Sequence, residues 1–419
     1  MDFDLILREA CIAGRADIVT DIGIAKGRIA AIAPDLPEGA PETRLDGRLV
    51  VPGFIETHIH LDKSCLLGRC QCEKGTLDEA VAAVAAAKRE FTHDDVYRRA
   101  STTLEKAIKN GTTRMRTHVE VDPRVGLTSL HALLQLKKDY AFAIDLQLCA
   151  FPQEGLLDDP GCEEVMVAAL EAGADVVGGA PYMDRDSHGQ IARIFALAQR
   201  FDLDIDFHLD FSLDAAHLDA LEVCRLADAT GWGGRVAVGH VTKFSAMPRA
   251  ELDALSRRLA SSGVAVTTLP STDLFLIGRD HEYNVPRGVA PVHRMAAQGV
   301  NCSISTNNVL NPFTPFGDCS LIRMANLYAN VTQVSRPADL ELCLAMITER
   351  PARMMNLRDY GLLPGNPADI VVLDCANEAS AIAELAQPLM VYRRGAMTVS
   401  RPAPVLIRPD AAHPDSAAA

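Results

Sequence analysis

The chain has 419 residues, of which 48% are hydrophobic and 23% charged, so it holds ample apolar material for a large globular core. Its formal net charge of −14 argues against nucleic-acid binding through a basic surface, and no stretch is apolar for long enough to predict a membrane span. The first residues lack the pattern of a signal peptide, and the 11 cysteines lack paired spacing, so we expect reduced thiols and a cytoplasmic location.

The first part of the chain, residues 1–51, contains short predicted strands. They cover residues 4–8, 16–20 and 28–32, and glycine and proline separate them. No helical pattern lies between them. This segment is therefore predicted to be a small β element rather than an α/β unit.

From residue 52 to residue 357, short apolar runs alternate with alanine-rich helical segments. Eight such strands that alternate with helices predict a (β/α)8 TIM-type barrel. An open doubly wound sheet would show the same alternation. Polar residues at the ends of nearly every strand, rather than at one point, favour the barrel. The predicted strands are 54–61, 113–121, 144–151, 176–180, 205–210, 236–240, 264–269 and 301–305, and the clearest helices are 77–90, 94–108, 129–138, 163–172, 190–200, 215–229 and 249–261.

Short strands return after the barrel. A turn at 365–369 leads into a strand at 370–373. We expect residues 358–405 to pack with residues 1–51 as one composite β domain, a small β-sandwich formed by both chain ends. The tail at 406–419 is rich in Ala, Pro and Asp and is predicted to be disordered.

His58-Ile59-His60 is the strongest local signal for chemistry. Side chains alternate along a strand, so His58 and His60 point to the same side. Two imidazoles that project together at a strand end can both bind a metal ion. The position of this pair on the first predicted barrel strand favours that interpretation over two ordinary core histidines.

Two later strands also carry a terminal histidine, His208 in the strand 205–210 and His240 at the end of 236–240. Active sites of TIM-type barrels lie at the carboxyl ends of the strands, where these side chains would meet. Imidazole ligands suit Zn²⁺ or Fe²⁺, and an open coordination position would activate a water molecule. We therefore predict one bound divalent metal ion.

Several segments resemble the amidohydrolase superfamily, in particular its cytosine deaminase-like branch with the N-isopropylammelide amidohydrolase relatives. The similarity spans about residues 1–400 and includes a first-strand motif and a return to the β domain near the end. The segments that carry it are Val51–Asp62, Arg116–Asp122, Leu146–Gly155, Phe207–Asp210, Val238–Thr242 and Gly361–Leu373.

The resemblance implies roles for individual residues. His58, His60 and His208 would be metal ligands, and His240 would orient the attacking water. Gln153 matches a glutamine that binds the amide edge of a pyrimidine, although a loop residue that caps backbone groups is the alternative.

Two positions depart from the family pattern. Phe211 stands where the family has a proton-shuttling glutamate, and Asn307 aligns with the strand-8 aspartate that binds the metal and acts as general base. Neither a phenyl ring nor an amide accepts a proton near neutral pH. Phe211 is instead an aromatic wall, and Asn307 a weak metal ligand. Asn308 is predicted to bind substrate with Gln153 and Phe211.

Three residues are candidates to replace the missing acid–base groups. Asp210 and Asp62 are both predicted to face the site, and Lys63 lies beside Asp62. The alternative for the two aspartates is to orient a histidine. Asp210, Lys63 and His240 are therefore the predicted catalytic residues.

Three functions agree with this pattern. The first is a hydrolase that cleaves a C–N bond of a small, planar or cyclic nitrogenous substrate with a metal-activated water. The second is a cytosine or aminopyrimidine deaminase, which the two departures disfavour. The third is a non-catalytic metal- or ligand-binding descendant. A small-molecule substrate is the expected partner, without nucleic acid or membrane, and a homo-oligomer is left open.

Overall fold

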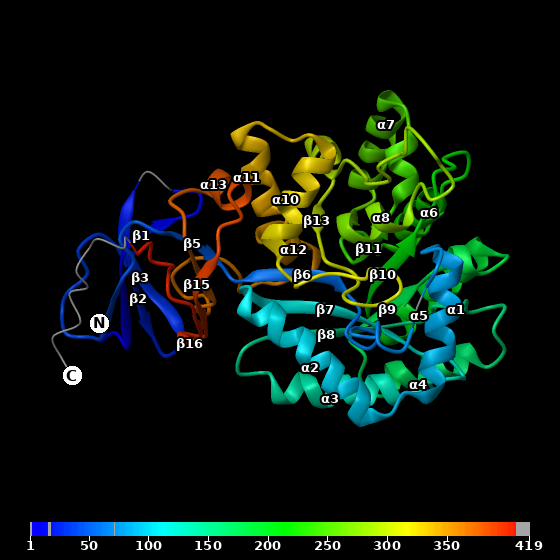
Figure 1. Cartoon of the computed structure of the whole chain (residues 1–419), viewed down its shortest axis with the longest axis horizontal. Coiled ribbons are helices and arrows are strands. Elements are labelled where there is room, and N and C mark those ends of the chain that lie inside the picture. Colours follow the sequence, from blue (N-terminus) through cyan, green and yellow to red (C-terminus); the bar gives the residue numbers. More distant parts are fainter. Residues whose placement is uncertain (1, 16–17, 71, 408–419) are drawn as a thin grey trace.

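The computed structural model describes residues 2–15, 18–70 and 72–407. These residues form two lobes (Figure 1). The smaller lobe combines strands from the beginning and the end of the chain, drawn in blue and red, and the larger lobe contains the helices and strands between them. The predicted tail, 406–419, lies outside the described residues apart from its first two.

The larger lobe is built around eight parallel strands that pair in sequence order. The ring closes where the first strand meets the last, since Ile59 bridges to Asn307 in parallel and the Asn307 N–H donates to the His58 carbonyl oxygen at 2.8 Å. This closure confirms the predicted barrel over an open sheet. The strands are β6 (Phe54–Ile59), β7 (Thr112–Glu120), β8 (Asp145–Phe151), β9 (Val176–Gly179), β10 (Asp204–Leu209), β11 (Val236–His240), β12 (Val264–Thr268) and β13 (Cys302–Ile304).

Helices cover the outside of the barrel. In α2 the Thr92 hydroxyl accepts from the Asp95 N–H at the first turn, and the buried residues Val96, Ala100 and Leu104 recur every fourth position, which places them on one face. Each predicted helical segment contains a helix: α1 (Leu77–Ala87) with η1 (Lys88–Glu90), α2 (His93–Lys109), α3 (Thr128–Asp139), α4 (Cys162–Glu171), α5 (Ser187–Phe201), α6 (Asp219–Thr230) and α7 (Arg249–Ser261).

Further helices, which the sequence analysis did not predict, follow the last two barrel strands or precede the final strands. Between β12 and β13 the chain forms two short helices, joined by residues 277–291, which contain turns and bends but no helix or strand. None of the helices among the described residues is long and apolar enough to span a bilayer. These additional elements are α8 (Pro270–Leu276), α9 (Val292–Ala297), α10 (Leu321–Thr332), α11 (Pro337–Ala345), α12 (Glu349–Met354) and α13 (Glu378–Ala383), with short 3-10 turns η2 (Pro181–Met183) and η3 (Thr242–Ala246) elsewhere.

The smaller lobe is a mixed sheet to which both chain ends contribute. β14 from the end of the chain pairs antiparallel with β5, so that Ile370 lies opposite Pro52. The residues Leu7, Ile22 and Val372 belong to the apolar core of this lobe. The strands are β1 (Leu5–Ile12), β2 (Val19–Ala25), β3 (Arg28–Ala33), β4 (Glu42–Arg44), β5 (Leu49–Pro52), β14 (Ile370–Leu373), β15 (Pro388–Arg393) and β16 (Ala396–Ser400).

Candidate metal centre and active site

Histidines from four barrel strands meet at the carboxyl end of the barrel. β6 carries His58, and His60 follows directly after its last residue; β7 carries His118, β10 carries His208 and β11 ends on His240. All five side chains are buried. The strand alternation that predicted His58 and His60 on one side therefore does bring them together with the histidines of later strands.

The backbone is left-handed at three positions where a barrel strand gives way to its loop. φ is 51° at Asp210, 69° at His240 and 66° at Asn307. Such conformations are uncommon for residues other than glycine and cluster at functional sites. Here they end the regular alternation of side chains, so the direction of each of these side chains is set by its turn.

Nε2 of His208 lies 3.1 Å from Nε2 of His58 and 3.1 Å from Nε2 of His60. A neutral imidazole has one N–H and one bare nitrogen, so His208 cannot make a good hydrogen bond to both neighbours. Three buried ring nitrogens at this spacing fit a shared cation, because metal–nitrogen distances near 2.0–2.1 Å place ligand nitrogens about 3 Å apart. We call His58, His60, His118 and His208 the histidine cluster.

A second set of three possible metal ligands contains His118 in place of His60. Ring nitrogens of His58, His118 and His208 also lie within 4.8 Å of one another. The His118 ring, however, stacks on His58 with centroids 3.9 Å apart, and its Nε2 lies 3.6 Å from Asp206 Oδ1. We favour His58, His60 and His208, since their Nε2 atoms make the closer contacts.

Burial lowers the pKa of His58, His60 and His208 well below the usual histidine value, and neighbouring positive groups lower it further. The imidazoles are therefore neutral near pH 7, which is the form that binds a metal ion. Nδ1 of each of the three has no hydrogen-bond partner among the described residues. The described residues thus offer these Nδ1 atoms no hydrogen bond, although all three rings are buried.

His240 is held differently, between a carboxylate and an amide. Its Nδ1 lies 2.6 Å from Oδ1 of Asp273, and its Nε2 lies 3.3 Å from Nδ2 of Asn307. The second carboxylate oxygen of Asp273 accepts from the Leu269 N–H at 3.2 Å. Oδ1 of Asn307 is buried without a partner among the described atoms.

Asp210 lies outside the cavity that the histidines line. Its two carboxylate oxygens accept from the N–H groups of Asp219 and Ala220 at 3.0 and 3.1 Å, and Lys243 Nζ lies 3.2 Å away. Asp210 therefore caps the start of α6. Its predicted catalytic role stays a prediction that this arrangement does not support.

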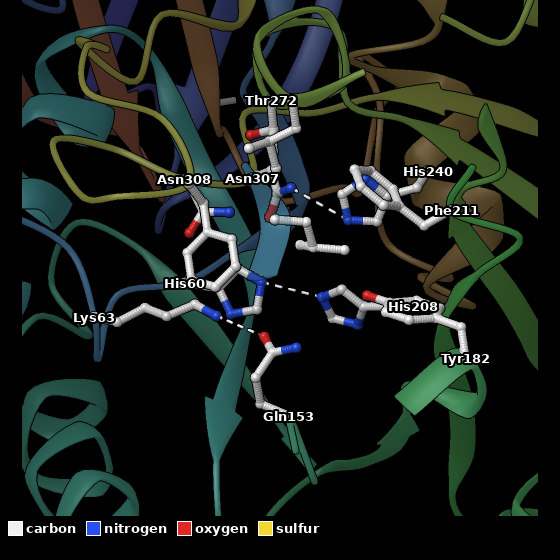
Figure 2. A pocket seen from close by; sticks show the side chains of 13 residues that line it. His60, Lys63, Gln153, Tyr182, His208, Phe211, His240, Thr272, Asn307 and Asn308 are labelled. Atoms are coloured by element: carbon white, nitrogen blue, oxygen red, sulfur yellow. Dashed lines mark hydrogen bonds between the residues drawn. The ribbon is translucent and has the colours of Figure 1, made fainter. Parts of the chain in front are cut away.

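A small cavity lies beside the histidines (Figure 2). Its free volume of about 10 Å³ has room for about one water molecule. The Phe211 ring meets His240 edge-on, with centroids 4.7 Å apart. The lining of the cavity includes every predicted substrate-binding residue and most of the other predicted site residues. The lining residues are His60, Lys63, Leu77, Gln153, Tyr182, His208, Phe211, His240, Thr272, Leu276, Asn307, Asn308 and Phe313.

Lys63 connects this cavity to a second buried group. Its ammonium donates to Gln153 Oε1 at 2.8 Å and to Glu120 Oε1 at 2.7 Å, and it lies 4.3 Å from the centre of the Phe313 ring. Lys63 and Gln153 thus form one polar edge of the cavity, as Figure 2 shows.

Glu120 is shared with a further lysine. Lys88 Nζ lies 3.1 Å from the other oxygen of Glu120 and 2.5 Å from Asp122, and it also pairs with Glu154. Burial and the neighbouring Glu120 raise the pKa of Glu154 to about 7, although Lys88 opposes this shift. The charged cluster, as we call it, consists of Lys63, Lys88, Glu120, Asp122 and Glu154.

Several residues of the site were not predicted from the sequence. Asp206 shares its strand face with His208, so alternation could have found it, and His118 lies in a segment that already resembled the family. Glu56 accepts from the Thr306 N–H with both oxygens at 3.1 Å and joins β6 to the turn after β13. Asp273 has no local signal, because it approaches His240 from a different element, the helix α8 that follows β12.

Comparisons with known proteins agree with this architecture. The model of the Amidohydrolase family matches residues 44–401. N-isopropylammelide isopropyl amidohydrolase from Pseudomonas sp. (strain ADP) is 30% identical over 412 residues, which cover 95% of this chain and 98% of that protein. Pterin deaminase from Rhizobium rhizogenes is 26% identical over 382 residues, which cover 90% and 86%.

Solved structures show the same similarity. The structure of 5-methylcytosine deaminase from Klebsiella pneumoniae, liganded with 5-fluorocytosine, superposes with a TM-score of 0.92 and 30% identity. The match covers 96% of this chain and 99% of the other. The likeness therefore extends over both lobes.

Proposed function

This chain belongs to the amidohydrolase family and is an enzyme of that family, and from this premise we propose that it hydrolyses a C–N bond of a small, planar or cyclic nitrogenous substrate. The observation that carries the proposal is the meeting of three imidazole Nε2 atoms beside a small cavity that His240 also lines. The names of the relatives support the bond class, since they describe an amidohydrolase and deaminases.

His58, His60 and His208 would hold one divalent ion, Zn²⁺ or Fe²⁺, because their bare ring nitrogens suit either metal. Such an ion supplies Lewis acidity and lowers the pKa of a water molecule toward neutrality. The unpartnered Oδ1 of Asn307 supports its predicted place as a weak further ligand. The test is elemental analysis of the purified protein, with the double variant His58→Ala, His60→Ala as its comparison. Metal well below one ion per chain after reconstitution, or unchanged in the variant, would contradict the assignment.

Substrate would bind between a polar edge and an aromatic wall. Lys63, Gln153 and Asn308 present hydrogen-bonding groups to the cavity, and the rings of Phe211 and Tyr182 line it from the other side (Figure 2). Such a site suits a flat ring that carries carbonyl or amino groups. The cavity is too small for such a ring as it stands, so substrate entry requires side chains around it to move.

A substrate screen tests the bond class. We would incubate the zinc-reconstituted enzyme with N-isopropylammelide, pterin and 5-methylcytosine, and measure the release of amine or ammonia. The metal-depleted enzyme and the double histidine variant are the controls. Turnover that depends on metal and on both histidines supports the proposal, whereas tight binding without turnover would favour a ligand-binding protein.

Cytosine itself is expected to be a poor substrate. Phe211 cannot transfer a proton, and a positioned acid–base group contributes about 10²–10⁴-fold to rate. Steady-state kinetics with cytosine are the measurement. A kcat/KM of about 10⁴ M⁻¹s⁻¹ or more, which is common for natural enzyme–substrate pairs, would contradict this expectation.

We also propose a cytoplasmic location, which the eleven free cysteines support because disulfides are rare in that compartment. The net charge of −14 supports a small-molecule partner rather than a nucleic acid. Whether copies of the chain associate is a separate prediction, which size measurement in solution tests.

A further inference from the structure

We propose that Asp273 is a positioning residue that holds His240 in the tautomer with its proton on Nδ1, so that the bare Nε2 faces the cavity and accepts a proton from the attacking water. This inference rests on the proposed hydrolysis, but the part that concerns the tautomer can be tested without any substrate.

Asp273 is itself held on both sides. It is fully buried in the first turn of α8, and Oδ2 accepts from the Leu269 N–H at 3.2 Å. Oδ1 lies 2.6 Å from Nδ1 of His240. An ionised carboxylate only accepts hydrogen bonds, so Nδ1 must carry the proton of this contact.

The opposite nitrogen of the ring is consequently bare in the neutral imidazole. Asn307 agrees with this assignment, because its amide Nδ2 is placed to donate to His240 Nε2 at 3.3 Å. An amide can turn either of its ends toward a partner, and only the NH₂ end suits a bare ring nitrogen. Asp273 and Asn307 therefore define one consistent hydrogen-bond chain through His240.

The other residues that line the cavity do not offer an equivalent proton acceptor. Phe211 and the side-chain amides of Asn307 and Asn308 cannot accept a proton near neutral pH. His60 and His208 direct their Nε2 atoms toward each other, and the ammonium of Lys63 donates to Glu120 and Gln153. The hydroxyl groups of Tyr182 and Thr272 are not proton acceptors near neutral pH either. His240 therefore remains as the proton acceptor, and the attacking water has to take the place of the Asn307 amide at its Nε2.

The proton transfer balances over the reaction. As the water oxygen bonds to the substrate carbon, one water proton passes to Nε2, and the resulting imidazolium is paired with the Asp273 carboxylate. When the C–N bond breaks, the same proton passes from Nε2 to the departing nitrogen, and His240 returns to its neutral tautomer. Water and substrate thus yield a hydroxyl or carbonyl product and an amine, with no other reactant.

The decisive variant is Asp273→Asn. Its amide oxygen can satisfy only one of the two donors that Asp273 now serves. If this oxygen still accepts a hydrogen bond from the Leu269 N–H, the NH₂ group of the new side chain faces His240 and donates to Nδ1. The ring proton then moves to Nε2. We expect the zinc content and KM to stay near wild type, while kcat falls about 10²–10⁴-fold.

The tautomer can be observed directly in zinc-loaded protein with ¹⁵N-labelled histidine rings, by two-bond ¹⁵N–¹H correlation spectra. His240→Gln assigns the signal, and N-isopropylammelide and pterin are the kinetic probes. Asp369→Asn is the control, a buried carboxylate of the smaller lobe that also accepts a backbone N–H, from Arg394 at 2.8 Å. It should leave both the His240 signal and kcat unchanged.

Two results would overturn the proposal. One is a spectrum that shows the proton of wild-type His240 on Nε2. This measurement needs neither Asp273→Asn nor turnover, so it remains decisive even if Asp273→Asn does not fold. The other is Asp273→Asn that keeps wild-type kcat. Absence of turnover with the probes in wild type would instead count against the proposed function, and the tautomer result would stand by itself.

Discussion

The charged cluster and the histidine cluster adjoin at the cavity, where Lys63 of the one and His60 of the other both line it, and their polar atoms are satisfied in opposite ways. In the charged cluster every ammonium and carboxylate has a partner of opposite charge, as with Lys88 between Glu120 and Asp122. In the histidine cluster the Nε2 atoms of His58, His60 and His208 have only one another as polar partners among the described residues. The charges of the first cluster are paired within the chain, whereas the imidazoles of the second are arranged to bind a group from outside the chain, such as a metal ion.

The physical reason for the difference is the cost of burial. A buried polar atom without a partner costs about 1–3 kcal/mol, and a buried unpaired charge costs more. Folding tolerates the histidines because burial keeps them neutral, as the depressed pKa values of His58 and His60 indicate. The charges of Lys63 and Lys88 are instead compensated by the neighbouring carboxylates, so removal of a carboxylate leaves a buried charge without its partner. We therefore expect the charged cluster to govern stability and the histidine cluster to govern metal binding.

The largest effect should come from breaking the charged cluster. Glu120→Gln leaves Lys63 and Lys88 buried with less opposing charge, so the free energy of unfolding should fall by about 3–5 kcal/mol. Urea denaturation of the metal-free protein measures it. Glu163→Gln, which removes a partly exposed ion pair with Arg193, should change the same quantity by less than about 1 kcal/mol. Equal effects of the two variants would refute the contrast.

A pair of variants separates the two sets of three ligands. His60→Gln should abolish zinc binding, together with the stabilisation that zinc provides, about 2.7 kcal/mol at a zinc concentration 100 times Kd. His118→Gln should retain the metal, because the Nε2 atoms of the favoured set do not include it. Zinc content and thermal unfolding with and without zinc are the measurements. The reverse result would select His58, His118 and His208 instead.

The charged cluster should also give stability a distinct pH dependence through Glu154. The pKa of this carboxyl is about 7 in the folded chain and 4.5 without perturbation, so the folded chain holds a proton that the unfolded chain releases in this window. Its stabilising contribution is complete below about pH 4.5 and is lost as the pH rises through 7. Glu154→Gln should remove this decline, about 1–3 kcal/mol. Parallel declines in both proteins between pH 5 and 8, by urea denaturation, would contradict the assignment.

The smallest effect concerns the residue that adjoins both His240 and the metal site. Asn307→Asp adds a negative ligand, so zinc should bind roughly tenfold more tightly, or about 1.4 kcal/mol. The acid limb of the rate profile should shift to higher pH, since a metal ion with more ligand charge acidifies its water less. Competition with a chromogenic chelator gives the affinity. Asn308→Asp is the control for added charge alone. If position 307 gives no tighter binding than position 308, it does not face the metal.

Much of the fold could be predicted because it depends on local pattern. The strand at 236–240 was predicted at its observed bounds, Val236–His240, since short apolar runs between helices are the mark of a buried parallel strand. His58 and His60 were placed together for a similarly local reason, the two-residue period of a strand. The helices after β12 were missed, although α10 does carry a helical pattern, with buried Leu321, Ala325 and Tyr328 three or four residues apart.

The sequence by itself therefore determined the alternation of strands and helices, the family resemblance and the shared face of His58 and His60. The tertiary structure decided what no short window contains. Barrel closure brought Asn307 beside His58, the left-handed turn after β10 directed Asp210 to α6 instead of the cavity, and the helix after β12 brought Asp273 to His240. Periodicity gives the direction of a side chain only while the strand lasts, and the chemistry of this site lies just beyond the ends of the strands.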